Sequence, residues 1–341
     1  MRMTQTNKPY ISVIAHTNRV GGLDVLFEGL KHQTFKDFEL VLVDSIYKYR
    51  KDVVAEKSKE YDFVVKHVEP LHNIFPVANY CILTNTGLCA AAGEVVYLTG
   101  DYCYLHEETL ARCSAFHSKT PRNFALLFPG THGPVKIDTV SDNFPRDNQY
   151  GHRGDVMSAS LLNTPEAEYV ATQNKWSNAY AEDLDKGLFD KVLWSIFHKP
   201  FTNEDTITDF IDPKELFIET DKFASCPTDT AAPAFHGLCC LRYDSFKRDF
   251  LLDANGLDED MDGSGGFQDT ELARRLVRLY GAQFFAMNFQ STINIITKYY
   301  LLPRKITKGY NNYNIIVQRN GREVPLTNNS ITEWKKSKVN V

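Results

Sequence analysis

Two alternating periods in the first hundred residues constrain the fold more than any other feature of this sequence. Short continuous apolar runs, such as YISVIA and FELVLVD, are separated by segments in which apolar residues recur at helical spacing. A strand that is apolar at every position is buried on both faces, whereas a strand with one face in water alternates with polar residues. The pattern therefore predicts a mostly parallel α/β sheet covered by helices on both faces.

The same reading extends along the chain. The expected strands are residues 10–15, 38–44, 62–70, 94–101, 235–243 and 282–289, and the expected helices are 22–35, 76–92, about 173–198, 203–217 and 269–281. The final forty residues have no strong period and are interpreted as an appendage. The predicted division is residues 1–115 and 116–300 as the two halves of one α/β domain, followed by a basic extension at 301–341.

Composition excludes several classes of protein. The chain has 341 residues, of which 43% are hydrophobic and 24% charged, as expected of a globular protein rather than a disordered one. The amino terminus is polar, and no apolar stretch approaches the roughly 20 residues needed to span a bilayer. Seven cysteines without CxxC spacing indicate reduced thiols rather than a disulfide framework or a zinc knuckle. A cytoplasmic location is expected.

Charge is unevenly placed along the chain. The formal net charge is −5, but residues 298–341 carry nine Lys and Arg against two Glu, which leaves +7 there and −12 on the rest. Aromatic residues, including Tyr310, Tyr313 and Trp334, are interleaved with these cations. Such a segment is compatible with solvation, with attraction to anionic lipid or with nucleic acid.

Polar residues follow three of the expected strands where each strand ends. The first run is followed by His16, Thr17 and Asn18, the second ends at Asp44, and the fourth ends at Thr99, Gly100 and Asp101. Ligands of open parallel sheets bind beyond the carboxyl ends of the strands. We therefore expect these side chains to converge on one site.

Four motifs in order support a resemblance. PYISVIAHTNR, LKHQTFKDFELVLVD, NTGLCAAAGEVVYLTGD and GLDEDMDGSGGFQDTELARRL resemble the family 2 glycosyltransferases of the GT-A fold, over about residues 9–110 and 235–290. The resemblance implies a nucleotide-sugar donor, for which UDP is the family-level expectation, and inverting transfer of a hexose or pentose to an acceptor hydroxyl. Residues 118–230, on the side of the fold that shapes the acceptor site in that family, match nothing that identifies the acceptor.

In that family, two or three acids around a DxD motif hold Mg²⁺ or Mn²⁺ against the donor diphosphate. Here the sequence reads TGDYC, so Asp101 stands alone between Thr99 and Tyr102. Hard cations prefer oxygen ligands, and phosphates supply several of them. The resemblance assigns Asp101 to the metal and diphosphate, with His236 or His106 as a second ligand; a purely structural histidine is the alternative.

The donor nucleotide is expected to lie along the same strand ends. A ribose diol suits a carboxylate, so Asp44 is assigned to the base or ribose, with His16, Thr17 and Asn18 beside it. The alternative for Asp44 is an acid that caps the next segment. Asn85 is assigned to the donor as well, although the family's preceding Arg is replaced here by Thr84 and the neighbouring small residues are those of a closely packed helix.

The downstream motif implies the catalytic base. The family's ED pair followed by a helix is FQDTELARRL here, so Gln268 replaces the first acid and Asp269 is retained. The resemblance makes Asp269 the general base that takes the proton of the acceptor hydroxyl, and the alternative is a simple helix cap. The acids of DEDMDG just before it are interpreted as a solvated turn.

Two other classes of protein compete with this one, and the acceptor also has alternatives. A nucleotide-dependent oxidoreductase or methyltransferase on a Rossmann sheet needs a glycine-rich turn such as GxGxxG directly after the first strand, which IAHTNRVGG does not provide. A non-catalytic carbohydrate-binding relative is compatible with the acids lost at 99, 102 and 268. A glycan, a lipid-linked saccharide or a protein is the expected acceptor, and the basic tail also permits DNA bearing a hydroxymethylated base.

Overall fold

The computed structural model describes residues 8–18, 23–73, 79–101, 103–128, 130–133, 219–225, 244–263, 267–289, 292–295, 325–327 and 329–339. The helices predicted at about 173–198 and 203–217 and the strand predicted at 235–243 lie outside these residues, as does His236.

An eight-stranded sheet forms the centre of the molecule, in the order β3-β2-β1-β4-β9-β6-β10-β8. Its strands are β1 (Ile11–Thr17), β2 (Phe38–Asp44), β3 (Val64–Val68), β4 (Val95–Gly100), β6 (Phe124–Leu127), β8 (Glu219–Ser225), β9 (Asp244–Lys247) and β10 (Gln283–Phe289). All the pairs are parallel except those of β9 with β4 and β6 and that of β8 with β10. The predicted mostly parallel α/β sheet is confirmed.

Burial explains why the first strands were readable from sequence. Every residue of β1 and β2 is buried, including the polar ones. The apolar residues alternate between two cores: Ile14 and Val43 face one, while Val13 and Leu42 face the other. A continuous apolar run is thus the mark of a strand covered on both faces.

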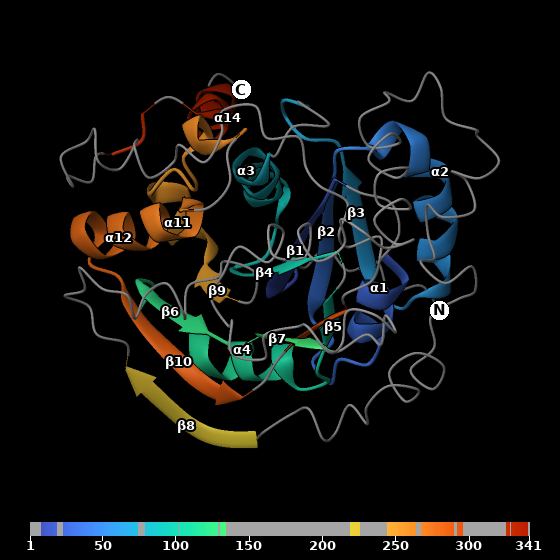
Figure 1. Ribbon diagram of the computed structural model, residues 1–341, viewed down its shortest axis with the longest axis horizontal. Helices are drawn as coiled ribbons and strands as arrows, with labels where there is room; N and C mark the ends of the chain where they lie inside the picture. Colours follow the sequence, from blue (N-terminus) through green and yellow to red (C-terminus); the bar gives the residue numbers. More distant parts are fainter. Residues whose placement is uncertain are drawn as a thin grey trace, which may run out of the picture.

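Helices cover both faces of this sheet (Figure 1). One core includes residues of α3 (Tyr80–Ala90), α11 (Arg248–Asp253), α12 (Gln268–Tyr280) and α14 (Ser330–Val339), and these four helices gather on one side of the molecule in Figure 1. The other core includes residues of α1 (Leu23–Lys31), α2 (Tyr47–Lys57) and α4 (Thr109–His117). Short 3₁₀ turns lie at η1 (Ser58–Glu60) and η2 (Glu259–Met261).

Two glycines let α3 and its following turn lie directly on β1. A Cβ on Gly87 would come 2.3 Å from Cγ2 of Ile14, and one on Gly93 would come 2.6 Å from the backbone nitrogen of Ser12. No side chain fits at these distances without displacing the strand. Close helix-to-sheet packing was the sequence interpretation of the small residues in this segment, and the geometry agrees with it.

Four of the described helices, α2, α4, α11 and α14, were not predicted from the sequence, and α2 and α11 show why. The segment of α2, YKYRKDVVAEK, has no apolar stripe, and α11 is only six residues long. Both are held by their surroundings: Val54 of α2 and Phe250 of α11 are buried in the two cores. Local periodicity carried too little signal to separate them from loops.

The last helix is not an appendage. Ile331 of α14 is completely buried in the core that α3 and α12 share, and Trp334 packs against it. Lys335 donates to the carbonyl of Leu252 at 2.5 Å and to Oδ1 of Asn255 at 2.8 Å, at the end of α11. Residues 329–339 of the segment interpreted as an appendage therefore pack on the core of the α/β domain.

The packing of α14 on the core also involves side chains of the basic and aromatic segment that the hypothesis of DNA binding was based on. Two cations lie over the Trp334 ring, Arg248 and Lys338, each 5.8 Å from its centroid. Burial lowers the pKa of Lys335. Trp334 and Lys335 thus stabilise the fold, and their side chains are not simply exposed for binding to nucleic acid.

A small second sheet lies beside the first, in the order β5-β11-β7, with β5 (Cys103–Leu105), β7 (Gly130–Gly133) and β11 (Thr292–Ile295). β11 is antiparallel to β5 and parallel to β7. Across the described part of the chain, no helix combines the length and apolar character needed to cross a membrane.

Candidate active site

The carboxyl ends of β1, β2 and β4 meet at one edge of the sheet, as the sequence predicted. Parallel pairing sets Thr17 opposite Asp44, and His16 opposite Gly100. Asp101 is the residue that follows β4 and is buried, with 2% of its surface exposed. Three polar strand ends that are far apart in the sequence are therefore neighbours.

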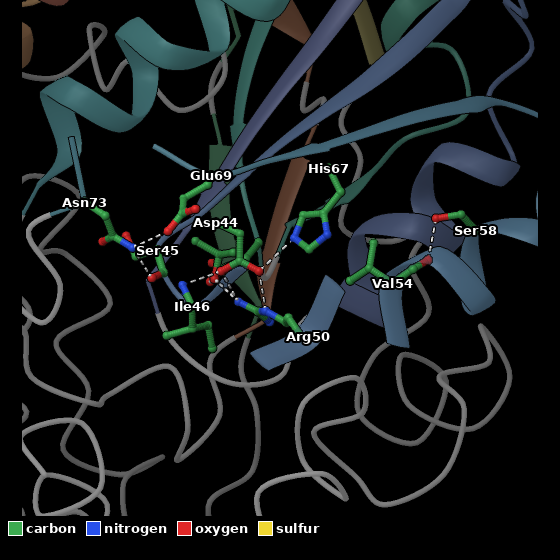
Figure 2. A network of polar contacts seen from close by, with 11 residues as sticks. Asp44, Ser45, Ile46, Arg50, Val54, Ser58, His67, Glu69 and Asn73 are labelled. Carbon is green, nitrogen blue, oxygen red and sulfur yellow. Dashed lines mark hydrogen bonds and ion pairs between the residues drawn. The ribbon is translucent and has the colours of Figure 1, made fainter. Parts of the chain in front are cut away.

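Asp44 is the centre of a buried polar cluster (Figure 2). Its Oδ1 accepts from the backbone nitrogen of Ile46 at 2.9 Å and from Nη2 of Arg50 at 3.1 Å. Its Oδ2 is 2.6 Å from Nε of Arg50 and 2.9 Å from Nε2 of His67. Burial alone would raise the pKa of Asp44, but the Arg50 charge and the bonds with His67 and Arg50 outweigh it, so the pKa lies below its ordinary value.

Arg50 connects this cluster to Asp101. Its side chain is fully buried, and its Nη2 also lies 3.1 Å from Oγ1 of Thr17. The Thr17 hydroxyl in turn donates to Oδ2 of Asp101 at 2.7 Å. A continuous line of hydrogen bonds thus runs from Asp44 through Arg50 and Thr17 to Asp101.

Among the other residues predicted to contact the sugar-nucleotide donor, His16, Asn18 and Thr99 are also buried. His16 packs edge-to-face on Tyr80 of α3, with ring centroids 4.7 Å apart. Asn18 directly follows the last residue of β1, and 9% of its surface is exposed. The Thr99 hydroxyl is buried and has no hydrogen-bond partner among the described residues. Gly100 separates Thr99 from Asp101 and has room for a Cβ, since the nearest atom would be 3.4 Å away.

Asn85 ties α3 to a turn that is distant in the sequence. Its Nδ2 donates to the carbonyl of Leu257 at 2.9 Å and to Oε1 of Glu259 at 2.8 Å, and its Oδ1 accepts from the nitrogen of Leu257 at 2.8 Å. A Cβ on Gly256 would lie 2.2 Å from that same oxygen. These bonds give Asn85 a structural role at the contact of α3 with residues 256–259.

Asp269 is the second residue of α12 and is half-buried, and its Oδ1 accepts from the backbone nitrogen of Thr270 at 2.8 Å. Phe267 just before it has a left-handed backbone, φ 66°. Both the base and the cap assignments are compatible with a carboxylate in this first turn. The surroundings of Asp269 add a feature that the sequence did not suggest, a second carboxyl group.

That second carboxyl group belongs to Asp244, the first residue of β9. β9 is antiparallel to β4, with Ser245 opposite Tyr97, so Asp244 is level with Leu98, in the half of β4 that leads to Asp101. It is 1% exposed, and neither of its oxygens has a hydrogen-bond partner among the described residues. Burial, and then the charge of Asp269, raise the pKa of Asp244 well above its usual range.

The described residues contain no group of three or more His, Cys, Asp or Glu arranged to hold a metal ion. His106, an expected second ligand, accepts from the backbone nitrogen of Glu108 through Nδ1 at 3.2 Å. Asp101 therefore offers a single carboxylate. Such a site fits a cation that takes most of its ligands from phosphates and water.

The acids of DEDMDG do not form a solvated turn, contrary to the sequence interpretation. Asp258 and Asp262 are both buried. Asp262 accepts from the backbone nitrogens of Cys81 and Ile82 at 2.8 and 2.9 Å, at the amino terminus of α3. Burial raises the pKa of Asp262 to about 7, although these two bonds lower it. A run of acidic residues predicts a solvent-exposed turn only where none of the carboxylates accepts hydrogen bonds from the backbone nitrogens at the start of a helix.

Sequence reasoning missed Arg50, His67 and Asp244. Arg50 stands among lysines and tyrosines in a helix without an apolar stripe, and His67 sits in a strand at the edge of the sheet. Asp244 carried one weak signal: an acid at the start of a strand that is otherwise buried.

No protein-family model and no curated protein matches the sequence. Among solved structures, S. aureus TarS 1–349 in complex with UDP matches with 15% identity and a TM-score of 0.44 over 84% of this chain and 60% of that chain. TarS 1–349 with UDP-GlcNAc matches with 13% identity and a TM-score of 0.43, over 84% and 58% of the two chains.

The mannosyltransferase PcManGT from Pyrobaculum calidifontis, in complex with GDP-Man and Mn²⁺, matches with 16% identity and a TM-score of 0.44. This match covers 97% of the present chain and 70% of that chain. The present chain spans about 60% of the TarS chains that it matches. At these identities and TM-scores the matches establish no activity, and the functional argument rests on the residues themselves.

Proposed function

We propose that this chain is a GT-A glycosyltransferase that moves a sugar from a nucleotide-sugar donor to an acceptor hydroxyl with inversion at the anomeric carbon. The observation that carries the proposal is the hydrogen-bonded convergence of Thr17, Asp44 and Asp101 at the carboxyl edge of β1, β2 and β4. The motifs that resemble family 2 glycosyltransferases supply these residues.

On the donor side, Asp101 faces the diphosphate. The residue set suits a divalent cation, Mn²⁺ or Mg²⁺, that is shared between Asp101 and the phosphates, and such a cation neutralises the charge that the leaving diphosphate develops. His16, Thr17, Asn18 and Thr99 line the same edge. The buried Thr99 hydroxyl is suited to a hydrogen bond with the donor because it has no partner among the described residues.

On the acceptor side, Asp269 acts as the general base. The acceptor oxygen attacks the anomeric carbon and its proton passes to the Asp269 carboxylate, while the bond from that carbon to the diphosphate oxygen breaks and the nucleoside diphosphate leaves. Asp244 and Asp269 lie near enough for the charge of one to raise the pKa of the other. Asp244 lies one position beyond the Tyr97–Ser245 pair, toward the carboxyl end of β4, and this register supports the proposal of a base near Asp101.

The test is nucleoside diphosphate release from a panel of UDP-, GDP- and dTDP-sugars, with and without Mn²⁺, in water as the default acceptor. Asp269→Asn is expected to lower turnover by about 10²- to 10⁴-fold, the usual contribution of a general base, with donor binding retained. Asp101→Asn is expected to lose the donor-induced thermal shift. Asp249→Asn, at an exposed acid of α11, is the matched control.

The results separate an enzyme from a non-catalytic sugar-binding relative. A donor that shifts the melting temperature but is never cleaved, in wild type and Asp269→Asn alike, would support the binding protein. If no nucleotide changes the melting temperature, both the enzyme and the sugar-binding protein are contradicted.

A further inference from the structure

The Asp44 carboxylate is fully occupied by the protein itself. A carboxylate offers about four lone-pair positions on its two oxygens. Four protein groups already take them: the nitrogen of Ile46, Nε and Nη2 of Arg50, and Nε2 of His67. A ribose hydroxyl would have to displace one of these partners (Figure 2).

We propose that Asp44, Arg50 and Thr17 form a buried positioning relay that orients the Asp101 carboxylate, and that Asp44 does not itself contact the nucleotide. This inference deepens the proposed function and rests on it, because the role of Asp101 at the diphosphate belongs to that function. It gives the strand-end acid a different role from the one that the sequence resemblance implies.

The direction of each hydrogen bond follows from the donors available. A guanidinium has donors only, so Oγ1 of Thr17 must accept from Nη2 of Arg50. The single hydrogen of the Thr17 hydroxyl is thereby directed to Oδ2 of Asp101, 2.7 Å away. Asp101 is the acceptor in this bond, and the anchored oxygen sets the direction of its carboxylate.

Arg50 itself cannot move freely, because Asp44 holds it. The pair makes two close contacts, Nε to Oδ2 at 2.6 Å and Nη2 to Oδ1 at 3.1 Å, and both side chains are fully buried. A two-contact carboxylate pair fixes the plane of the guanidinium as well as its position. Residues behind a metal ligand commonly orient it in this way, and their loss typically weakens metal binding 10- to 100-fold.

The first test is Thr17→Val, which keeps the shape of the side chain and removes the hydroxyl. The readout is binding of UDP with Mn²⁺, measured by calorimetry and by the electron paramagnetic resonance signal of free Mn²⁺, so that no turnover is needed. We expect binding to weaken by about 10- to 100-fold. Thr17→Ser restores the hydroxyl and should recover most of the affinity, and Thr120→Val, at a hydroxyl that bonds Phe116 on α4, should leave it unchanged.

The second test removes the relay without stranding a buried charge. Single Asp44 or Arg50 variants leave one charged partner buried alone and are prone to unfold. The double variant Asp44→Leu/Arg50→Met removes both charges together. A folded double variant that loses UDP–Mn²⁺ affinity to the same degree as Thr17→Val supports the relay.

Asp101→Asn separates failure of the inference from failure of the proposed function. If Asp101→Asn abolishes UDP–Mn²⁺ binding while Thr17→Val and the double variant bind as wild type, the relay is wrong and the proposed function stands. If Asp101→Asn binds as wild type, the donor site is wrong and the relay has no role. A UDP complex in which Asp44 contacts the ribose would also overturn the inference.

Discussion

Replacing Asp244 by Asn should change how stability depends on pH. Asp244 is 1% exposed, and neither carboxyl oxygen has a hydrogen-bond partner among the described residues. Burial raises its pKa well above the usual range, and the nearby charge of Asp269 raises it further. The folded protein therefore retains a proton that the unfolded chain releases.

The sign of the effect follows from that difference. The contribution of a carboxyl whose pKa is raised on folding is fully present below its unfolded pKa, about 3.9, and is lost as the pH rises through its folded pKa. Over that window one proton changes the free energy of unfolding by up to about 1.4 kcal/mol per pH unit. Asn cannot titrate, so Asp244→Asn should lack this decline.

The measurement is urea unfolding of wild type and Asp244→Asn at each unit from pH 5 to pH 8. The difference in unfolding free energy between them should grow with pH in favour of the variant. A buried Asn amide without partners carries its own cost of about 1–3 kcal/mol, so the slope is the test and not the absolute value. Asp262, whose pKa is raised to about 7, remains in both proteins and cancels to first order.

Asp244→Leu and Asp249→Asn complete the design. Leu also removes the titration, without a buried amide, and should show the same change in slope. Asp249 is exposed and pairs with Arg122, so its substitution should leave the slope unaltered. Parallel stability curves for wild type and both Asp244 variants would refute the argument, because they would mean that Asp244 releases its proton as readily folded as unfolded.

Three further predictions concern the frame around the site. Ile331→Ala should cost about 2–5 kcal/mol in urea unfolding, because the side chain is fully buried in the main core; an unchanged midpoint would mean that α14 is detached. Gly93→Ala should destabilise by about 1–3 kcal/mol or more, since its Cβ would lie 2.6 Å from the β1 backbone, and should exceed Gly281→Ala, where only the positive φ of 65° opposes the change; equal melting temperatures would contradict the packing argument. Arg275→Met should cost about 3–5 kcal/mol by stranding Glu271, its partner at 2.7 Å, and adding Glu271→Gln should recover part of that loss in a double-mutant cycle.

The sequence was informative where the signal is local. The runs of β1 and β2 are apolar throughout because both of their faces are buried, and this alone predicts a strand in a covered, mostly parallel sheet. The same logic predicted that the ends of three such strands would meet, and the pairing of Thr17 with Asp44 and the bond from Thr17 to Asp101 show that they do.

Other features of the site were determined by the tertiary structure alone, because they depend on contacts that the sequence does not show. β9 is antiparallel to both of its neighbours in the sheet. It brings Asp244 near Asp269, which lies 25 positions further along the printed sequence. Asp44 looks like a ligand contact in the sequence, but Arg50 and His67 occupy its lone pairs in the fold. Residue type tells which bonds a side chain is able to make, whereas only the packed neighbours determine which of those bonds are already taken.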